Sequence, residues 1–166
     1  MHCPCNSNLA YADCCQPFHE NRDENLPLPD TAEQLMRSRY SAFVLQKTDY
    51  IVATTLPAQQ PFLDKQAISD WAKDTDWAGL EVINHMPKLN KHHASVAFNA
   101  YFNVVENAET KRLFHHELSY FVKIGKDDVT KWYFLDPTLN MSISQKQPCI
   151  CGSGEKFKRC CGKFLA

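Results

Sequence analysis

The cysteines of this chain constrain its fold more than any other feature. All eight lie in two copies of one pattern, Cys-x-Cys, eight residues, Cys-Cys, with one copy near each end of the 166 residues. The first copy consists of Cys3, Cys5, Cys14 and Cys15, and the second of Cys149, Cys151, Cys160 and Cys161. A single offset superposes the two copies, so the chain carries the same cysteine module twice.

The spacing of each copy suits a metal site. Side chains two positions apart in an extended segment point to the same side, so Cys149 and Cys151 can present both sulfurs to one point. The eight residues that follow suffice for a turn and a short helix that return the second pair. Four thiolates around one point form the tetrahedral pattern of structural zinc, which leaves no position open for substrate. We therefore expect two zinc ions per chain.

Disulfide bonds are the main alternative, since an even number of cysteines allows them. The segment that begins at Met1 has neither the basic nor the apolar region of a secretory signal, which favours a cytoplasmic protein with reduced thiols. Adjacent cysteines such as Cys160 and Cys161 also make a poor disulfide pair, given the usual Cα separation. Redox sensing is a third alternative, which metal binding by all eight cysteines would disfavour.

The residues between the cysteine pairs predict how each module turns. Gly152 and Gly154 allow positive φ angles, and the first copy has Asn6 and Asn8 at the same positions. Asn tolerates the left-handed region better than most residues, so both copies keep that conformation accessible. One serine in each copy stands where the N-cap of the returning helix is expected, Ser7 and Ser153.

Composition indicates a soluble globular protein, with 44% hydrophobic and 22% charged residues. No apolar run approaches the ~18 residues that a membrane helix needs. The formal net charge of −1 argues against general nucleic-acid binding, so we expect no specific DNA binding. Two zinc–tetrathiolate sites would make the charge more negative still, so any attraction to an acidic partner must be local.

The middle of the chain predicts helices first and strands afterwards. Asp30 is a capping-box-like start for a helix that runs to about Lys47, and further helices are expected over Asp49–Leu56 and Lys65–Trp77. Alternating polar and apolar residues predict strands over 80–86, 95–105, 111–124 and 129–135, joined by short turns. This order indicates the α+β class with an antiparallel sheet. Alternation places one set of side chains on the face expected to pack on the helices: Phe114, His116, Leu118, Tyr120, Val122 and Ile124.

The cysteine pattern, with its Gly-Ser-Gly turn and the Lys156-Phe157-Lys158 centre, resembles the SEC-C motif, best known as the zinc-binding tail of the bacterial translocase motor SecA. The last ligand of SecA is histidine, whereas Cys161 and Cys15 stand there in this chain. Two such motifs around a middle domain resemble the YchJ family of bacterial proteins. Other shared segments are 31–43, 77–80, 116–121 and 132–133.

The resemblance implies a nuclear transport factor 2-like middle domain, a cone in which three helices lean into a curved sheet. The cysteine modules and the linker with Pro27 and Pro29 divide the chain into four parts. These are an N-terminal zinc module over 1–20, a linker over 21–29, the middle domain over 30–140 and a C-terminal zinc module over 141–166.

His116 is the strongest candidate for chemistry in the middle domain. Cones of this type often enclose a pocket, and a histidine facing it could act as a general base near neutral pH. The side chains that could join it are Tyr40, Tyr101, Tyr120, Trp132 and Asp136. Glu117 faces the other way by the same alternation, so His116 lacks an evident partner, and a hydrogen-bonded core histidine is the simpler interpretation. The pairs His92-His93 and His115-His116 match no recognised metal-ligand spacing.

The C-terminal module is locally basic, and its four candidate partner-binding residues are Lys156, Lys158, Arg159 and Lys163. The first copy has Ala12 and Asp13 at the positions of Lys158 and Arg159. Since that copy would hold zinc without the cations, the cations are not required for metal binding. They favour docking to an acidic surface.

We therefore expect a non-enzymatic, cytoplasmic zinc protein that serves as an interaction or adaptor module. Its C-terminal module would contact a protein partner or another acidic surface. The resemblance to the SecA tail implies, by analogy alone, a role in translation or protein export. The alternative is a small-molecule-binding protein or enzyme that uses a pocket near His116, with zinc modules that are purely structural.

Overall fold

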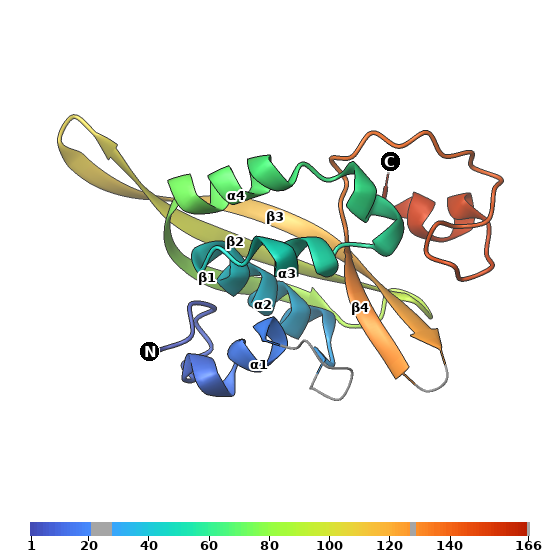
Figure 1. Ribbon diagram of the computed structural model, residues 1–166, viewed down its shortest axis with the longest axis horizontal. Coiled ribbons are helices and arrows are strands. Elements are labelled where there is room, and N and C mark those ends of the chain that lie inside the picture. Colours follow the sequence, from blue (N-terminus) through green and yellow to red (C-terminus); the bar gives the residue numbers. More distant parts are fainter. Residues whose placement is uncertain (21–27, 127–128, 166) are drawn as a thin grey trace.

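The computed structural model describes residues 1–20, 28–126 and 129–165, so most of the expected linker over 21–29 lies outside the described residues. Three helices of the middle domain pack on one face of a four-stranded antiparallel sheet, in which the strands follow the order β1-β2-β3-β4. The expected α+β class is confirmed. Figure 1 shows the N-terminal module beside α2 and the C-terminal module at the other end of the molecule, beyond β4.

The helices are α1 (Gln16–His19), α2 (Ala32–Val44), α3 (Thr48–Ala53) and α4 (Lys65–Asp74), with a 3-10 segment over Pro57–Phe62. The N-cap of α2 is Thr31 rather than the predicted Asp30, because its hydroxyl accepts the Gln34 backbone N–H at 3.1 Å. Within the described residues, no helix is long and apolar enough to cross a bilayer.

The third helix of the middle domain ends earlier than predicted. The prediction extended it to Trp77, but α4 stops at Asp74 and β1 begins at Asp76. From the strand, the Trp77 ring packs against Tyr40 and Trp71, with ring centroids 5.8 and 5.7 Å apart. This aromatic packing across the helix–sheet boundary outweighs the helical pattern.

The strands are β1 (Asp76–Met86), β2 (His93–Glu106), β3 (Glu109–Lys126) and β4 (Val129–Leu135), and each pairs with the next. Asn107 and Ala108, both with positive φ, form the tight turn of the long β2–β3 hairpin. The hairpin extends from the body of the molecule in Figure 1. Register shifts between Trp77 and Gly79 and between Val82 and Asn84 mark irregular pairing of β1 with β2, and such irregularities bend a strand locally.

The side chains of β3 alternate as predicted, but the prediction chose the wrong set to face the helices. The side chains that face the helices are those of His115, Glu117, Ser119 and Phe121, which line the space under α2 and α4. The predicted set lies on the opposite face, where His116 and Phe114 are exposed while Val122 is buried. The C-terminal module covers that opposite face beside Val122. Because both faces are covered there, both carry apolar residues.

Candidate metal centres and the central cavity

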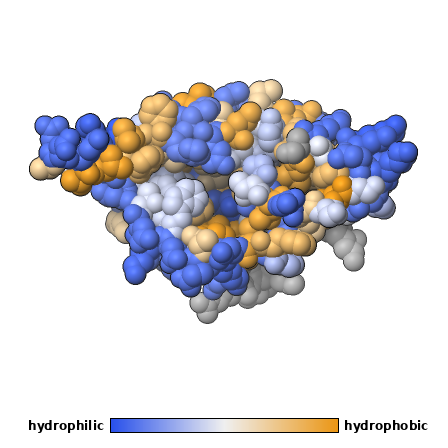
Figure 2. All heavy atoms as spheres, turned by 90° about the horizontal axis from the view of Figure 1, so that it is seen from above, coloured by the Kyte–Doolittle hydropathy of each residue, from blue (hydrophilic) through white to orange (hydrophobic). Residues whose placement is uncertain are grey.

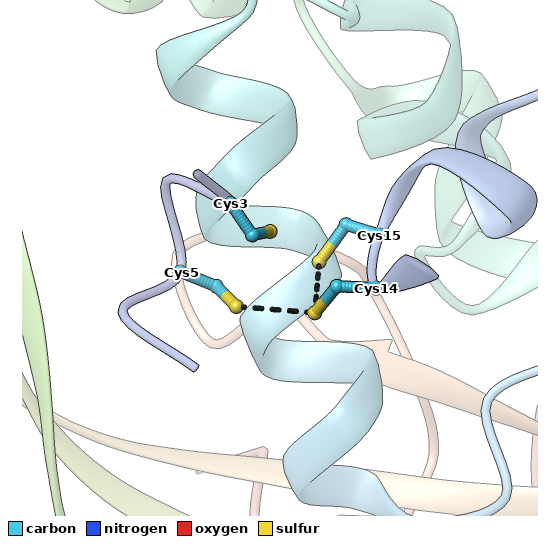
Figure 3. A group of neighbouring side chains, drawn as sticks. All are labelled: Cys3, Cys5, Cys14 and Cys15. Atoms are coloured by element: carbon cyan, nitrogen blue, oxygen red, sulfur yellow. Dashed lines mark hydrogen bonds between the residues drawn. The ribbon is translucent and has the colours of Figure 1, made fainter. Parts of the chain in front are cut away.

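The N-terminal module gathers four sulfurs into one small space. Figure 3 shows Cys3 and Cys5 on the first segment and Cys14 and Cys15 at the start of the helical segment, with their sulfurs turned toward one another. The Sγ atoms of Cys5 and Cys14 are 3.6 Å apart, and those of Cys14 and Cys15 are 3.8 Å apart. A zinc tetrahedron with Zn–S distances of ~2.3 Å has edges of about 3.8 Å. The four sulfurs therefore fit a tetrahedral metal ion.

The C-terminal module repeats this arrangement with its own four cysteines. The Sγ atoms of Cys151 and Cys160 are 3.5 Å apart, and all four sulfurs lie within 4.8 Å of one another. All four cysteines of this module are buried, whereas Cys14 of the first module is only half-buried. None of the eight cysteines forms a disulfide in the structure. Both centres can hold a metal ion.

The backbone of both modules takes the conformation that the sequence predicted. Asn6 and Asn8 have φ angles of 59° and 66°, and Gly152 and Gly154 have φ angles of 80° and 85°. These left-handed residues turn the chain so that a short hydrogen-bonded loop closes between the cysteine pairs. In the C-terminal copy the Cys149 N–H donates to the Glu155 carbonyl oxygen at 2.7 Å.

The serines of the two modules have a different role from the predicted helix caps. The hydroxyl oxygen of Ser7 lies 3.2 Å from Cys14 Sγ, and that of Ser153 lies 3.3 Å from Cys160 Sγ. Each hydroxyl also accepts a backbone N–H two residues ahead. Burial raises the pKa of Cys14 and Cys160, and the contact with the serine opposes that rise.

In each module, hydrogen bonding lowers the pKa of one cysteine thiol. Burial helps to raise the pKa of neighbouring thiols. Hydrogen bonding from Cys15 is the main cause that lowers the pKa of Cys5 to about 4. The same interaction, together with burial, raises the pKa of Cys15. Hydrogen bonding from Cys149 and then from Cys161 likewise lowers the pKa of Cys151. A metal ion bound by all four sulfurs would release the protons of the other thiols.

The N-terminal module is built into the middle domain rather than suspended from a linker. Arg37 of α2 donates from Nη1 to the Cys5 carbonyl oxygen at 2.7 Å, and Asn6 donates to the Leu80 carbonyl oxygen of β1 at 3.1 Å. His19 lies 2.7 Å from the Ser38 carbonyl oxygen through Nε2. Three of its cysteines belong to the same buried cluster as the residues of α2.

The C-terminal module packs on the opposite face of the sheet. Phe164 lies against the rings of Tyr120 and His93, with a centroid distance of 4.7 Å in each case. Its four cysteines share a buried cluster with Val122 and Leu135 of the sheet. His93 Nε2 lies 3.4 Å from Cys161 Sγ. The sequence analysis set this histidine aside because 68 positions separate it from the cysteine and local spacing carries no signal of the contact.

The four basic candidates of the C-terminal module all lie on the surface. Lys156, Lys158, Arg159 and Lys163 are exposed. Among the described residues, none of the four forms an ion pair.

A cavity of about 630 Å³ lies between the sheet and the helices of the middle domain. Aromatic rings from both layers form much of its wall, including Tyr40, Phe43, Trp71 and Trp77. In the view of Figure 2, hydrophobic atoms gather along the middle of the molecule and hydrophilic atoms at its ends. The cavity can accept an apolar molecule.

The structure places only part of the predicted pocket set at this cavity. Tyr40 and Asp136 line it, but His116 points to the outer face, where its Nδ1 lies 2.8 Å from Asn99 Oδ1. The histidine at the cavity is its neighbour His115. The other three candidates lie elsewhere: Tyr101 under Arg112, Tyr120 under Phe164 and Trp132 with its Nε1–H donated to Asp30.

Arg39 is a further residue of the cavity lining. It is buried, and its Nη1 donates to the Ile51 carbonyl oxygen at 2.8 Å and to the Thr54 hydroxyl at 2.7 Å. Its guanidinium carbon lies 4.3 Å from the centre of the Phe134 ring. Burial lowers the pKa of Arg39 to about 10, which leaves the side chain charged at neutral pH.

Comparison with known families matches the middle domain and both cysteine modules. The model of the YchJ middle domain, described as NTF2-like, matches residues 31–137, and the SEC-C motif matches residues 3–17 and 146–163. The chain belongs to the YchJ family. Its middle domain is the expected nuclear transport factor 2-like cone.

Relatives in this family share about half of the residues. A UPF0225 protein of Actinobacillus succinogenes is 51% identical over 98% of this chain and 97% of its own length. A UPF0225 protein of Haemophilus influenzae is 48% identical over 98% of this chain and 93% of its own length.

Two solved structures of SEC-C motif-containing proteins share the fold. The one from Psychrobacter arcticus is 57% identical with a TM-score of 0.88, and the match covers 98% of this chain and 96% of that one. The protein RPA3114 of Rhodopseudomonas palustris is 31% identical with a TM-score of 0.66, over 82% of this chain and 96% of that one.

Proposed function

We propose that the protein is a non-enzymatic cytoplasmic adaptor that holds two zinc ions and docks on an acidic protein surface through its C-terminal module. The observation that carries the proposal is the set of exposed cations on a turn held by four buried sulfurs. Zinc is supported by the donor set, since four thiolates at tetrahedral spacing suit zinc. The likeness of the module to the SecA tail supports partners in translation or protein export, by analogy.

The two modules differ in charge although they share one backbone. Lys158 and Arg159 are exposed in the second copy, whereas Ala12 and Asp13 stand at the same positions in the first. Both copies gather their sulfurs in the same way, so this difference has no counterpart in the metal geometry. Exposed cations on a rigid support attract an anionic surface and lose little conformational freedom when they bind it.

Charge reversal at Lys158 and Arg159 tests the proposal. We expect the double change to glutamate to abolish capture of partners from nuclease-treated cell extract, while zinc content and melting temperature stay unchanged. Rising salt should weaken capture by the wild type, because exposed charges are screened. The matched control reverses Lys73 and Lys91, which are also exposed but lie outside the module.

Full capture by the Lys158/Arg159 variant would contradict the docking proposal. Loss of wild-type capture after nuclease treatment would indicate that RNA, rather than a protein, supplies the acidic surface.

A second candidate function is the binding of a small apolar molecule, which the aromatic cavity favours. Trp71 and Trp77 line it, so their fluorescence should report binding of 1-anilinonaphthalene-8-sulfonate. Ala67→Phe should reduce this response because Ala67 is an exposed residue of the cavity lining. Gln66→Phe, at an exposed neighbour that is not part of the lining, is the control. Equal responses in the two variants would contradict binding in the cavity.

A further inference from the structure

His93 lies directly against the C-terminal sulfurs although it belongs to the sheet. It is the first residue of β2, and only 1% of it is exposed. Its Nε2 lies 3.4 Å from Cys161 Sγ and 4.0 Å from Cys160 Sγ. The ring is held in this position by Phe164 on one side and by Asn90 at its other nitrogen.

Asn90 determines which ring nitrogen of His93 carries a hydrogen. Its Oδ1 accepts the backbone N–H of His92 at 2.9 Å and that of His93 at 3.0 Å, so this oxygen is fixed as an acceptor. The same oxygen lies 2.8 Å from His93 Nδ1, which must therefore donate a hydrogen. The neutral ring then has its lone pair on Nε2, the nitrogen that faces the sulfurs. A hydrogen bond from Nδ1 to an oxygen is the usual support of a histidine that binds metal through Nε2.

The distances also suit a metal ligand. In a tetrahedral zinc site with sulfur at ~2.3 Å and imidazole nitrogen at ~2.0–2.1 Å, the nitrogen lies about 3.6 Å from each sulfur. Nε2 lies 4.0 Å from Cys160 Sγ, close to this value, and 3.4 Å from Cys161 Sγ, so it stands beside the position that Cys161 occupies.

We propose that His93 is a reserve ligand of the C-terminal centre, a residue that takes a coordination position when one thiolate is lost. The position is that of Cys161, whose sulfur lies nearest to Nε2. When Cys161 takes up a proton from solvent and leaves as a neutral thiol, its bond to the metal breaks and the Nε2 lone pair becomes free to bind. The imidazole then binds in its place, and the centre keeps three sulfurs and one nitrogen. This inference rests on the proposed zinc sites.

The N-terminal centre lacks such a ligand and provides an internal control. Cys15 is the counterpart of Cys161, and the nearby His19 has both ring nitrogens engaged, with the Tyr11 hydroxyl and the Ser38 carbonyl oxygen, each at 2.7 Å. Across residues 1–20, 28–126 and 129–165, no histidine nitrogen is hydrogen-bonded to an N-terminal sulfur. Loss of Cys15 should therefore not be compensated.

Matched serine substitutions test the inference in the full chain. Wild-type protein should hold two zinc ions, Cys15→Ser one, and Cys161→Ser still two. Cobalt-loaded Cys161→Ser should show the ligand-field bands of a site with three sulfurs and one nitrogen. Adding His93→Gln to Cys161→Ser should reduce the metal content to one ion, whereas His93→Gln alone should keep two. Adding Asn90→Ala to Cys161→Ser should weaken the C-terminal site about tenfold, because the ring loses its orienting hydrogen bond.

Three outcomes separate this inference from the zinc proposal. A wild type without zinc would overturn both. A wild type with two ions and a Cys161→Ser variant with one would overturn only the role of His93. Cobalt spectra of Cys161→Ser that stay the same after His93→Gln would show that His93 is not the fourth ligand and would also overturn it. If the histidine variant fails to fold, ¹⁵N NMR of Cys161→Ser decides, since Nε2 must shift when zinc is added and Nδ1 must stay protonated.

Discussion

Two glycines of the C-terminal module occupy very different surroundings. A Cβ atom at Gly162 would lie 2.5 Å from the Phe157 carbonyl oxygen and 2.9 Å from its carbonyl carbon, which are backbone atoms that cannot move aside freely. A Cβ atom at Gly154 would meet no atom within 4 Å, and the residue needs only its positive φ of 85°. The first copy meets the same need with Asn8, at a φ of 66°.

Substitutions at these glycines should therefore differ in cost. Gly162→Ala should lower the free energy of unfolding by about 1–3 kcal/mol, as overpacking does, and should also reduce the C-terminal zinc content. Gly154→Asn should cost less than about 1 kcal/mol, because Asn enters the left-handed region with little strain. Urea denaturation with zinc analysis measures both effects. Equal costs would show that the contact at Gly162 relaxes.

Residue type predicted the backbone conformation of the modules well, but it did not predict which face of the sheet a side chain occupies. The positive φ angles of the two modules followed from Asn and Gly alone, since few other residues adopt them. The orientation of His116 did not follow, because alternation gives two sets of residues without saying which set meets the helices. The position of His93 could not be predicted either, since it depends on how the C-terminal module docks on the start of β2.

At the scale of elements, the two modules bury their cysteines to different degrees. The C-terminal module contributes four buried cysteines to a cluster with the sheet, whereas the N-terminal module leaves Cys14 half-buried. His93 and Phe164 further shield the second centre. A chelator therefore reaches the first centre more easily.

We expect a chelator to remove the N-terminal zinc first. Burial limits access to the sulfurs of the C-terminal centre, and the exposed cations around it favour the thiolate form of its cysteines. Rates of zinc release should be measured on wild-type protein and on variants in which Cys15→Ser or Cys151→Ser disables one centre. Faster release from the protein that retains only the C-terminal centre would contradict this order.

Element boundaries were predictable where local patterns acted alone. The strand β4 was predicted over its observed residues, and β2 and β3 were each found within two residues of their ends. The end of α4 was predicted too late, because Trp77 lies in β1 and packs against Tyr40 of α2 and Trp71 of α4. Tertiary packing decided this boundary.

For the whole molecule, the two centres connect the chain ends to two separate buried clusters. Cys5 and Cys15 pack with Leu35 on the helical side, and Cys149 and Cys161 pack with Val122 on the other side of the sheet. Each metal ion would therefore stabilise a part of the middle domain as well as its own module.

Removal of both zinc ions should lower the melting temperature without unfolding the middle domain. We expect a decrease of at least about 5 °C, which corresponds to roughly 2 kcal/mol for a chain of this size. Circular dichroism before and after chelation measures it, and re-addition of zinc should restore the original value. An unchanged melting temperature in zinc-free protein would show that the modules stabilise only themselves.

The packing of the C-terminal module on the face of the sheet away from the helices also affects folding during synthesis. Val122 and Tyr120 lie on a face that Phe164 and the C-terminal cysteines close, and those residues follow the whole sheet in the sequence. During synthesis the sheet therefore emerges from the ribosome with this apolar face uncovered. A nascent chain that stalls before Cys149 would present it to chaperones and proteases, so the module that follows the sheet completes this part of the fold.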